Sequence, residues 1–140
     1  MHLSESPDSL AKLHADCFTT PRPWRADEFD TLLKSRGVYL ILHDHGFALG
    51  RIAGPEAELL TIAVHPEAQG AGHGHRLMKD FLSESATLGA EDIFLEVAEN
   101  NPAALALYRK TGFAQVAKRA LYFKQTSGPA LTALILKHTI

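Results

Sequence analysis

The stretch Leu59-Leu60-Thr61-Ile62-Ala63-Val64, followed after four residues by Gln69-Gly70-Ala71-Gly72-His73-Gly74-His75-Arg76, decides the fold. Its first part is a nearly continuous apolar run, which predicts a strand buried on both faces of a sheet. Its second part is rich in glycine and leads into residues 72–88, whose apolar positions repeat at helical spacing. Backbone N–H groups at such a helix start form an anion site suited to phosphate, and Arg76 adds a positive charge.

Two common phosphate loops are excluded by spacing. A G-x-G-x-x-G fingerprint starting at Gly70 or Gly72 needs a third glycine where the chain has His75 or Leu77. A G-x-x-x-x-G-K-S/T loop needs a Gly-Lys pair, and the sequence has none. What remains is the pattern Q-x-x-G-x-G, and a flexible turn without a ligand is the alternative interpretation at this point.

Upstream of this stretch the sequence predicts two short helices and a hairpin. Apolar residues at helical spacing mark helices near residues 10–18 and 29–33. The β-branched and aromatic runs 38–42 and 47–53 are separated by a turn and predict two paired strands. Cys17 lies on the inner stripe of the first helix, so we expect a thiol in the core.

Downstream, the pattern alternates between strand and helix. Residues 93–97 form an apolar strand one helix after the preceding strand, which predicts a parallel crossover. Asn101 as N-cap and Pro102 at the first helical position open another helix. Two last strands are expected at residues 113–122 and 131–137. The predicted architecture is a mixed sheet with helices on both faces.

Composition describes one ordinary globular domain, residues 1–140, with 46% hydrophobic and 21% charged residues. The 14 basic and 16 acidic residues give a formal charge of −2, which is not the balance of a nucleic-acid-binding protein. The N-terminus has no secretory signal pattern, and no apolar run is long enough to span a membrane. We expect neither a nucleic-acid partner nor a membrane.

The cysteine and histidine content argues against disulfides and metal sites. Cys17 is the single cysteine, so no internal disulfide is expected, and a reducing cytoplasm fits best. The 8 histidines include the close pairs His43 with His45 and His73 with His75. Neither pair has a third ligand at familiar spacing, so no metal is predicted.

The Q-x-x-G-x-G pattern, preceded by Ile62-Ala63-Val64-His65-Pro66, resembles the acetyl-CoA-binding motif of the GNAT-type N-acetyltransferase superfamily. Further segments follow at the spacing seen in bacterial RimI-type enzymes, which acetylate the N-terminal alanine of a ribosomal protein: Leu95-Glu96-Val97, Asn101, Ala106-Leu107-Tyr108 and Thr111-Gly112-Phe113. The resemblance covers residues 58–123, with a weaker match at Pro23-Trp24. It implies an α/β (α+β) fold whose mixed, mostly antiparallel sheet has a central parallel strand pair and helices on both faces.

The resemblance also assigns roles to residues. It implies acetyl-CoA as co-substrate, Glu96 as general base and Tyr108 as general acid. The implied contacts to acetyl-CoA are Ile62, Ala63, Val64, Gly70, Ala71, Gly72, His73, Gly74, His75 and Asn101. Three places depart from the family pattern: Gly70 stands where a basic residue is usual, Ala120-Leu121 replaces a more polar, aromatic pair, and the Gly128-Pro129-Ala130 turn lacks the acidic residues often found there.

The residues alone leave other roles open. Strand alternation places Glu96 opposite Leu95, so it fits a surface carboxylate as well as a base. Tyr108 fits a packing tyrosine, and Asn101 already has a role as N-cap. An α-amine, with a pKa of about 7.7, costs roughly 1 kcal/mol to deprotonate at pH 7, against roughly 4.6 kcal/mol for a lysine with a pKa of about 10.4. An N-terminal amine is therefore the easier acceptor.

The favoured function is transfer of acetyl from acetyl-CoA to the N-terminal amine of a protein or peptide, such as a ribosomal protein, in the cytoplasm. The alternatives are the same chemistry on a small-molecule amine and a non-catalytic acyl-CoA-binding module. The acidic residues Asp27, Glu28 and Asp30 would attract either cationic acceptor. Because Cys17 is expected in the core, the acetyl group should pass directly to the amine.

Overall fold

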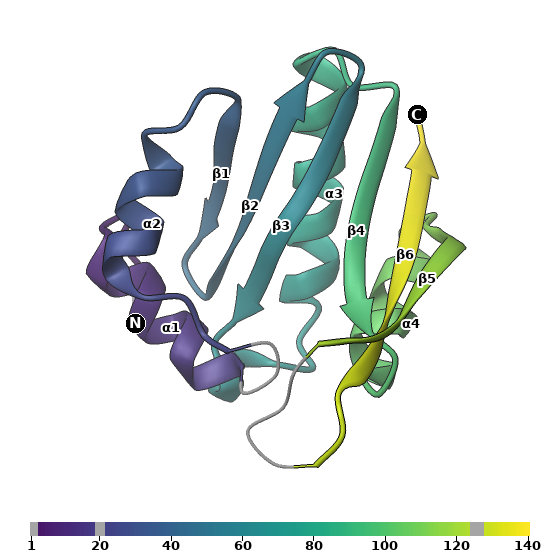
Figure 1. Cartoon of the computed structure of the whole chain (residues 1–140). Coiled ribbons are helices and arrows are strands. Elements are labelled where there is room, and N and C mark those ends of the chain that lie inside the picture. The colour runs from purple at the N-terminus through teal and green to yellow at the C-terminus, as the bar shows by residue number, and fades with distance from the viewer. Residues whose placement is uncertain (1–2, 19–21, 124–127) are drawn as a thin grey trace.

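The computed structural model describes residues 3–18, 22–123 and 128–140 (Figure 1). The elements in chain order are α1 (Pro7–Cys17), α2 (Ala26–Leu33), β1 (Val38–His43), β2 (Gly46–Ala53), β3 (Glu56–Val64), a 3-10 turn η1 (Pro66–Ala68), α3 (His73–Thr87), β4 (Asp92–Ala98), α4 (Pro102–Lys110), β5 (Ala114–Phe123) and β6 (Leu131–Thr139). The predicted order of helices and strands is confirmed. None of the described helices combines the length and apolarity that a bilayer crossing requires.

The strands form a six-stranded sheet in the order β1-β2-β3-β4-β6-β5. Only the central pair, β3 with β4, is parallel, and the pairs on either side are antiparallel. The predicted mixed, mostly antiparallel sheet with a central parallel pair is therefore confirmed. Parallel pairing here follows from α3, which carries the chain from the end of β3 back to the start of β4 (Figure 1).

Helices cover both faces of the sheet, and each face has its own apolar core. On one face, α3 and α4 pack Met78, Phe81 and Tyr108 against strand residues such as Leu95. On the other face, α1 and α2 pack a second cluster of buried side chains: Leu10, Leu13, Phe29, Phe47, Leu49 and Ala63. The sheet is thus the middle of three layers, and a ligand that reaches through it would meet both helix layers.

The start of β3 differs from the prediction. The strand begins at Glu56 rather than Leu59, and its first residues alternate between exposed and buried. Ala57 and Leu59 face the α3 core, whereas Glu56 and Glu58 remain exposed. The apolar run concealed this alternation because it begins only where both faces become covered.

A close approach between α3 and β2 fixes the position of α3. A Cβ atom on Gly50 would lie 2.4 Å from Cε1 of Phe81, so only glycine allows this contact. The Phe81 ring stacks on Tyr39 with centroids 5.5 Å apart, and the Tyr39 hydroxyl lies 2.6 Å from Ser85 Oγ. These contacts hold α3 with its N-terminus next to the end of β3.

Candidate active site

A β-bulge interrupts β3 at Leu60. The adjacent β2 residues Leu49 and Gly50 pair with Thr61 and Leu59, which leaves Leu60 without a partner on β2. A bulge of this kind adds one residue to one strand, bends it and increases its twist. The second half of β3 therefore runs in a different direction from the first half.

The parallel pairing of β3 with β4 stops at the bulge. It runs from Glu56 with Asp92 to Leu59 with Leu95 and goes no further. Backbone groups on the β4-facing edge of β3 beyond Leu59 consequently have no partner on β4. Polar backbone groups without a partner in a sheet are available to a ligand.

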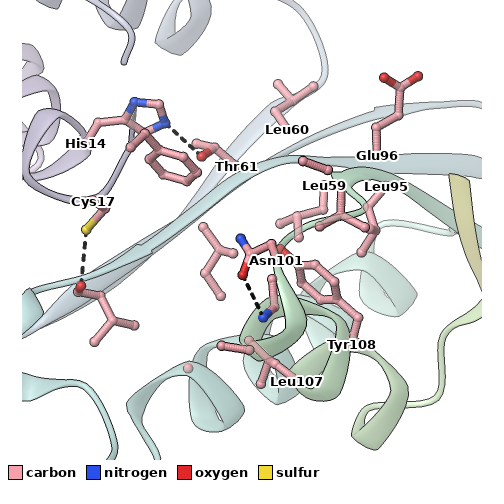
Figure 2. A pocket seen from close by; sticks show the side chains of 18 of the residues that line it. His14, Cys17, Leu59, Leu60, Thr61, Leu95, Glu96, Asn101, Leu107 and Tyr108 are labelled. Carbon is pink, nitrogen blue, oxygen red and sulfur yellow. Dashed lines mark hydrogen bonds between the residues drawn. The ribbon is translucent and has the colours of Figure 1, made fainter. Parts of the chain in front are cut away.

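A cavity of about 640 Å³ occupies the place where the two strands separate (Figure 2). Its wall includes His14 and Trp24 from the α1 and α2 side, and Asn101 and Tyr108 from α4 on the opposite side. Since its lining comes from both faces, the cavity passes through the sheet.

The structure brings most of the predicted site residues to this cavity. Those that line it are Ile62, Val64, Gly70, Gly72, His73, Gly74, Glu96, Asn101 and Tyr108. Ala63, Ala71 and His75 do not line it. Ala63 instead has its side chain in the α1 and α2 core, because alternation after the bulge turns it to that face.

Tyr108 rises from α4 toward Leu59 and Leu95 (Figure 2). Its side chain is only 7% exposed and lines the cavity, and its hydroxyl has no hydrogen-bond partner among the described residues. Desolvation by burial raises the pKa of the Tyr108 phenol above its usual value. The hydroxyl is thus a protonated donor at neutral pH that lacks a protein acceptor.

Glu96 points away from α4, on the opposite face of the sheet from Tyr108 (Figure 2). Its side chain is 28% exposed, and Oε1 lies 3.4 Å from Nη1 of Arg119 on β5. The guanidinium of Arg119 also lies 5.0 Å from the centroid of the Tyr122 ring. Glu96 is therefore a partly buried carboxylate held at the cavity wall.

The glycine turn ends in a helix start without a side-chain cap. Gly70 and Gly72 have φ values of 86° and 83°, which favour glycine, and Gly72 is the N-cap of α3. Ser6 and Asn101 cap α1 and α4 with side-chain oxygens, whereas α3 has no such bond. Its first N–H groups are consequently free of side-chain acceptors, as an anion site requires.

Two residues beside the turn have separate roles. Arg76 Nη2 donates to Nδ1 of His73 at 2.7 Å, which places the cationic guanidinium against the turn. Gly74 lies against α4, where a Cβ atom would make a tight contact of 3.3 Å with Cδ2 of Leu107. This glycine permits close packing of α3 on α4.

Asn101 has the predicted capping role. Its Oδ1 accepts a hydrogen bond from the backbone N–H of Ala104 at 3.1 Å. Because the cap uses only the oxygen, the side-chain NH₂ group of this cavity-lining residue is left for a ligand.

His14 lines the cavity, a position that the sequence analysis did not predict. It is 1% exposed, its Nδ1 accepts from the backbone N–H of Trp24 at 3.0 Å, and its Nε2 lies 2.9 Å from Thr61 Oγ1. The first bond makes Nε2 the protonated nitrogen, so it donates to Thr61. Burial lowers the pKa of His14 to about 4 against a weaker opposing effect of Glu28. The sequence signal that could have placed His14 in the interior is its spacing of four residues from Leu10, which puts both on the buried side of α1.

Cys17 only partly matches its prediction. It packs against the α1 and α2 core but is half-buried and lines the cavity, where Sγ donates to the Val64 carbonyl at 3.2 Å. Desolvation, and then the charge of Asp16, raise the pKa of the Cys17 thiol above its usual value. A protonated thiol is a poor nucleophile.

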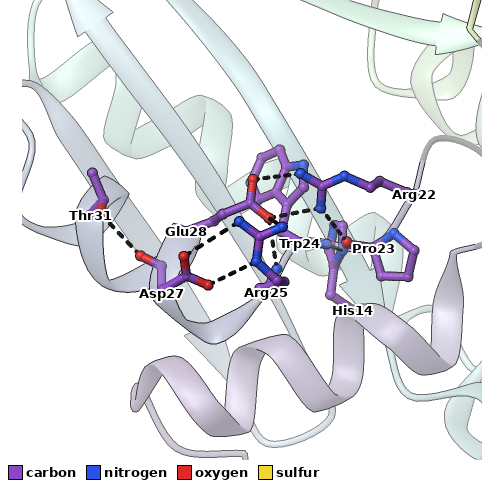
Figure 3. Close-up of polar contacts among 8 residues, drawn as sticks. All are labelled: His14, Arg22, Pro23, Trp24, Arg25, Asp27, Glu28 and Thr31. Carbon is purple, nitrogen blue, oxygen red and sulfur yellow. Dashed lines mark hydrogen bonds and ion pairs between the residues drawn. The ribbon is translucent and has the colours of Figure 1, made fainter.

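The acidic residues of α2 form ion pairs, and Figure 3 shows those of Asp27 and Glu28. Glu28 lies 2.8 Å from Arg22, and hydrogen bonds, that from Arg22 first, lower the pKa of Glu28 to about 2. Asp27 pairs with Arg25 at 3.1 Å, and Asp30 pairs with Lys34 at 3.0 Å. These ion pairs largely cancel the attraction that the three carboxylates were expected to exert on a cationic acceptor. None of the three lines the cavity.

Histidines near the turn are engaged with other side chains. His43 Nε2 lies 2.7 Å from Asp80, and the rings of His45 and His73 lie 4.7 Å apart. Within the part of the chain that the structure describes, no cluster of three or more His, Cys, Asp or Glu residues could hold a metal ion.

Comparisons with known proteins identify the family. The model of the acetyltransferase (GNAT) family matches residues 8–113. The chain is 36% identical over 131 residues to N-alpha-acetyltransferase RimI of Mycobacterium tuberculosis, covering 87% of this chain and 81% of that protein. It is 31% identical over 128 residues to the ribosomal protein bS18-alanine N-acetyltransferase of Escherichia coli K12, covering 89% and 86%. The crystal structure of the Escherichia coli ribosomal-protein-S18-alanine N-acetyltransferase superposes with a TM-score of 0.82 at 27% identity, covering 93% of this chain and 84% of that one.

The chain therefore belongs to the GNAT family of acetyltransferases, and its enzyme class is N-acetyltransferase. Within that class it is similar to enzymes of the RimI type over most of its length.

The buried His14 predicts a specific loss of stability in acid. Its pKa of about 4 in the folded chain lies below the ordinary value of 6.5, so protons bind the unfolded chain first as the pH falls. The contribution of the neutral His14 to the free energy of unfolding should be fully present above about pH 6.5. It should be lost between about pH 6.5 and about pH 4, which lowers the free energy of unfolding by up to about 3 kcal/mol. Urea unfolding at a series of pH values measures this, with His14→Gln expected to flatten the slope.

The matched control is His75→Gln, because His75 is exposed. It should leave the slope unchanged. If His14→Gln unfolds with the same pH dependence as the unaltered protein, His14 is not the group responsible.

Proposed function

We propose that this enzyme transfers the acetyl group of acetyl-CoA to the N-terminal α-amine of a protein, such as a ribosomal protein, in the cytoplasm. The observation that carries the proposal is the cavity through the sheet, with the Tyr108 hydroxyl on one face and the Glu96 carboxylate on the other. A donor and an acceptor that enter from opposite faces would meet between the two groups. The similar enzymes are named N-alpha-acetyltransferase and ribosomal protein bS18-alanine N-acetyltransferase, which supports an N-terminal α-amine as the acceptor.

The residues on the α3 and α4 side fit the donor. The uncapped start of α3 and the neighbouring Arg76 suit the phosphates of a coenzyme. Gly70 has open space around the position of a Cβ atom, so a bulky group can approach its backbone. The unpaired edge of β3 beyond Leu59 suits an amide-containing chain, which would extend the sheet. Acetyl-CoA supplies the reactive thioester.

In this proposal Glu96 acts as the base. An amine attacks a thioester only in its neutral form, so the acceptor ammonium must lose a proton. Glu96 faces the α1 and α2 side of the cavity, away from the donor residues, and accepts that proton directly or through a water molecule. The ion pair with Arg119 at 3.4 Å holds its carboxylate at the wall.

The bulged strand stabilises the carbonyl oxygen of the thioester, and Tyr108 protonates the leaving group. A backbone N–H on the free edge of β3 stabilises negative charge that develops on the carbonyl oxygen. The Tyr108 hydroxyl, protonated and without a protein acceptor, donates its proton to the departing sulfur.

The acetyl group passes directly from donor to amine. Cys17 is the single cysteine of the sequence. Its thiol donates to the Val64 carbonyl, and its raised pKa keeps it protonated. It therefore does not serve as an acetyl carrier.

Acceptor preference tests the proposal as a whole. With labelled acetyl-CoA, an alanine-initiated peptide should be acetylated with a higher kcat/KM than a lysine side-chain analogue, because its α-amine costs about 3.6 kcal/mol less to deprotonate at pH 7. Transfer to no peptide N-terminus would contradict it.

Tyr108→Phe removes only the proton-donating oxygen. We expect kcat to fall by roughly a hundredfold or more while the Kd for acetyl-CoA, measured by calorimetry, stays within about twofold. Tyr39→Phe is the control, since that hydroxyl contacts Ser85 outside the cavity and should leave kcat unchanged. A Tyr108→Phe enzyme with full turnover would rule out the acid role.

Glu96→Gln removes the base. The loss in kcat/KM should be largest below about pH 7, where an α-amine with a pKa of about 7.7 is mostly ammonium, and should shrink above about pH 9. Glu99→Gln, an exposed position just after β4 that does not line the cavity, is the control. A loss of the same size at every pH would argue against proton removal by Glu96.

A further inference from the structure

One carboxylate of the cavity has no part in the transfer described above. Glu58 lies on β3 one residue before the parallel pairing ends, and it lines the cavity with Glu96. Leu59 and Leu95 face the α3 core, so alternation turns Glu58 and Glu96 to the α1 and α2 face together. Two acidic side chains therefore border the same half of the cavity.

Glu58 differs from the other carboxylates near the cavity in its partners. The α2 carboxylates are paired with arginine or lysine, and Glu96 is paired with Arg119. Glu58 has no ion pair within 4.0 Å among the described residues, although Arg51 stands opposite it on β2. Of the two carboxylates in the cavity lining, Glu58 is thus the one without an ion pair among the described residues.

The surroundings of Glu58 disfavour its charge in the free enzyme. Desolvation first, and then the nearby charge of Glu96, raise the pKa of Glu58, while Arg51 and Arg119 lower it. A cation bound beside Glu58 would favour its charged form, because an opposite charge close by offsets the repulsion from Glu96. The free enzyme therefore carries a carboxylate whose interactions improve when a cation arrives.

The position of Glu58 sets the distance from such a cation to the reacting amine. Glu58 pairs in register with Phe94, two residues before Glu96 on the neighbouring strand. With a strand spacing of about 4.8 Å and a rise of about 3.3 Å per residue, the two backbones lie about 8 Å apart. That the cavity takes a ligand has independent support in Tyr108, which lines the cavity, is only 7% exposed and has no hydrogen-bond partner for its hydroxyl among the described residues.

We propose that Glu58 is a specificity-determining residue that selects acceptors with a second cationic group within about 8 Å of the reacting amine. A basic side chain at the second position of a peptide meets this requirement, and so does the second amine of a polyamine. This inference rests on the proposed function, since it concerns the acceptor of the same transfer.

The test compares matched acceptors at low salt. Peptides beginning Ala-Arg, Ala-Gln and Ala-Asp differ only in the charge of the second side chain, and spermidine with butylamine makes the same comparison for small amines. We expect kcat/KM to be about three- to fivefold higher for Ala-Arg than for Ala-Gln, and lowest for Ala-Asp. High salt should reduce the preference. The two acceptor series show whether the second charge comes from a peptide or a polyamine.

Protein variants assign the preference to Glu58. Glu58→Gln should abolish the difference between Ala-Arg and Ala-Gln, and Glu58→Lys should reverse it in favour of Ala-Asp. The matched control is Glu56→Gln, an exposed position on the same strand that does not line the cavity, and it should keep the preference. Because the KM for acetyl-CoA is measured in parallel, a general structural defect is recognised by its effect on both substrates.

The outcomes separate the two proposals. Acetylation of all three peptides with equal kcat/KM overturns the role of Glu58 and leaves the proposed function standing. A preference that persists in Glu58→Gln likewise overturns it. Absence of transfer to every amine overturns both.

Discussion

The bulge at Leu60 is the constraint on which the site depends. One extra residue in β3 ends the pairing with β4 at Leu59 and Leu95, and the strands separate from there. The separation creates the cavity, frees one edge of β3 and lets α4 bring Tyr108 under the gap. Without the bulge, the two strands would continue their ladder, and the two faces of the sheet would have no connection.

The two helix layers supply different chemistry to this gap. The α3 and α4 layer presents an uncapped helix start, an arginine and a phenol, which suit a phosphorylated thioester donor. The α1 and α2 layer presents aromatic rings fixed around the neutral His14, together with carboxylates from the strands. That side suits an amine that arrives as a cation. The two faces of the gap thus differ in their chemistry, and in the proposed reaction each face would receive one of the two substrates.

Local signals in the sequence predicted most of the fold and part of the site. The order of elements, the parallel pair and the cap at Asn101 follow from apolar periodicity and from residues that act on their immediate neighbours. The bulge could not be predicted, because it is defined by the register of β3 against β2. The His14 to Thr61 bond joins residues 47 positions apart, so no local pattern announces it. The roles of the implied contact residues stay predictions.

The short ladder between β3 and β4 has a thermodynamic consequence. The pairs from Glu56 with Asp92 to Leu59 with Leu95 form the whole strand-to-strand seam between the N-terminal and C-terminal halves of the described sheet. A substrate that bonds to the open edge of β3 while it packs on α4 would act as a brace across this seam. Substrate binding and thermal stability would then be linked, and the enzyme with substrate bound would be more stable than the empty enzyme.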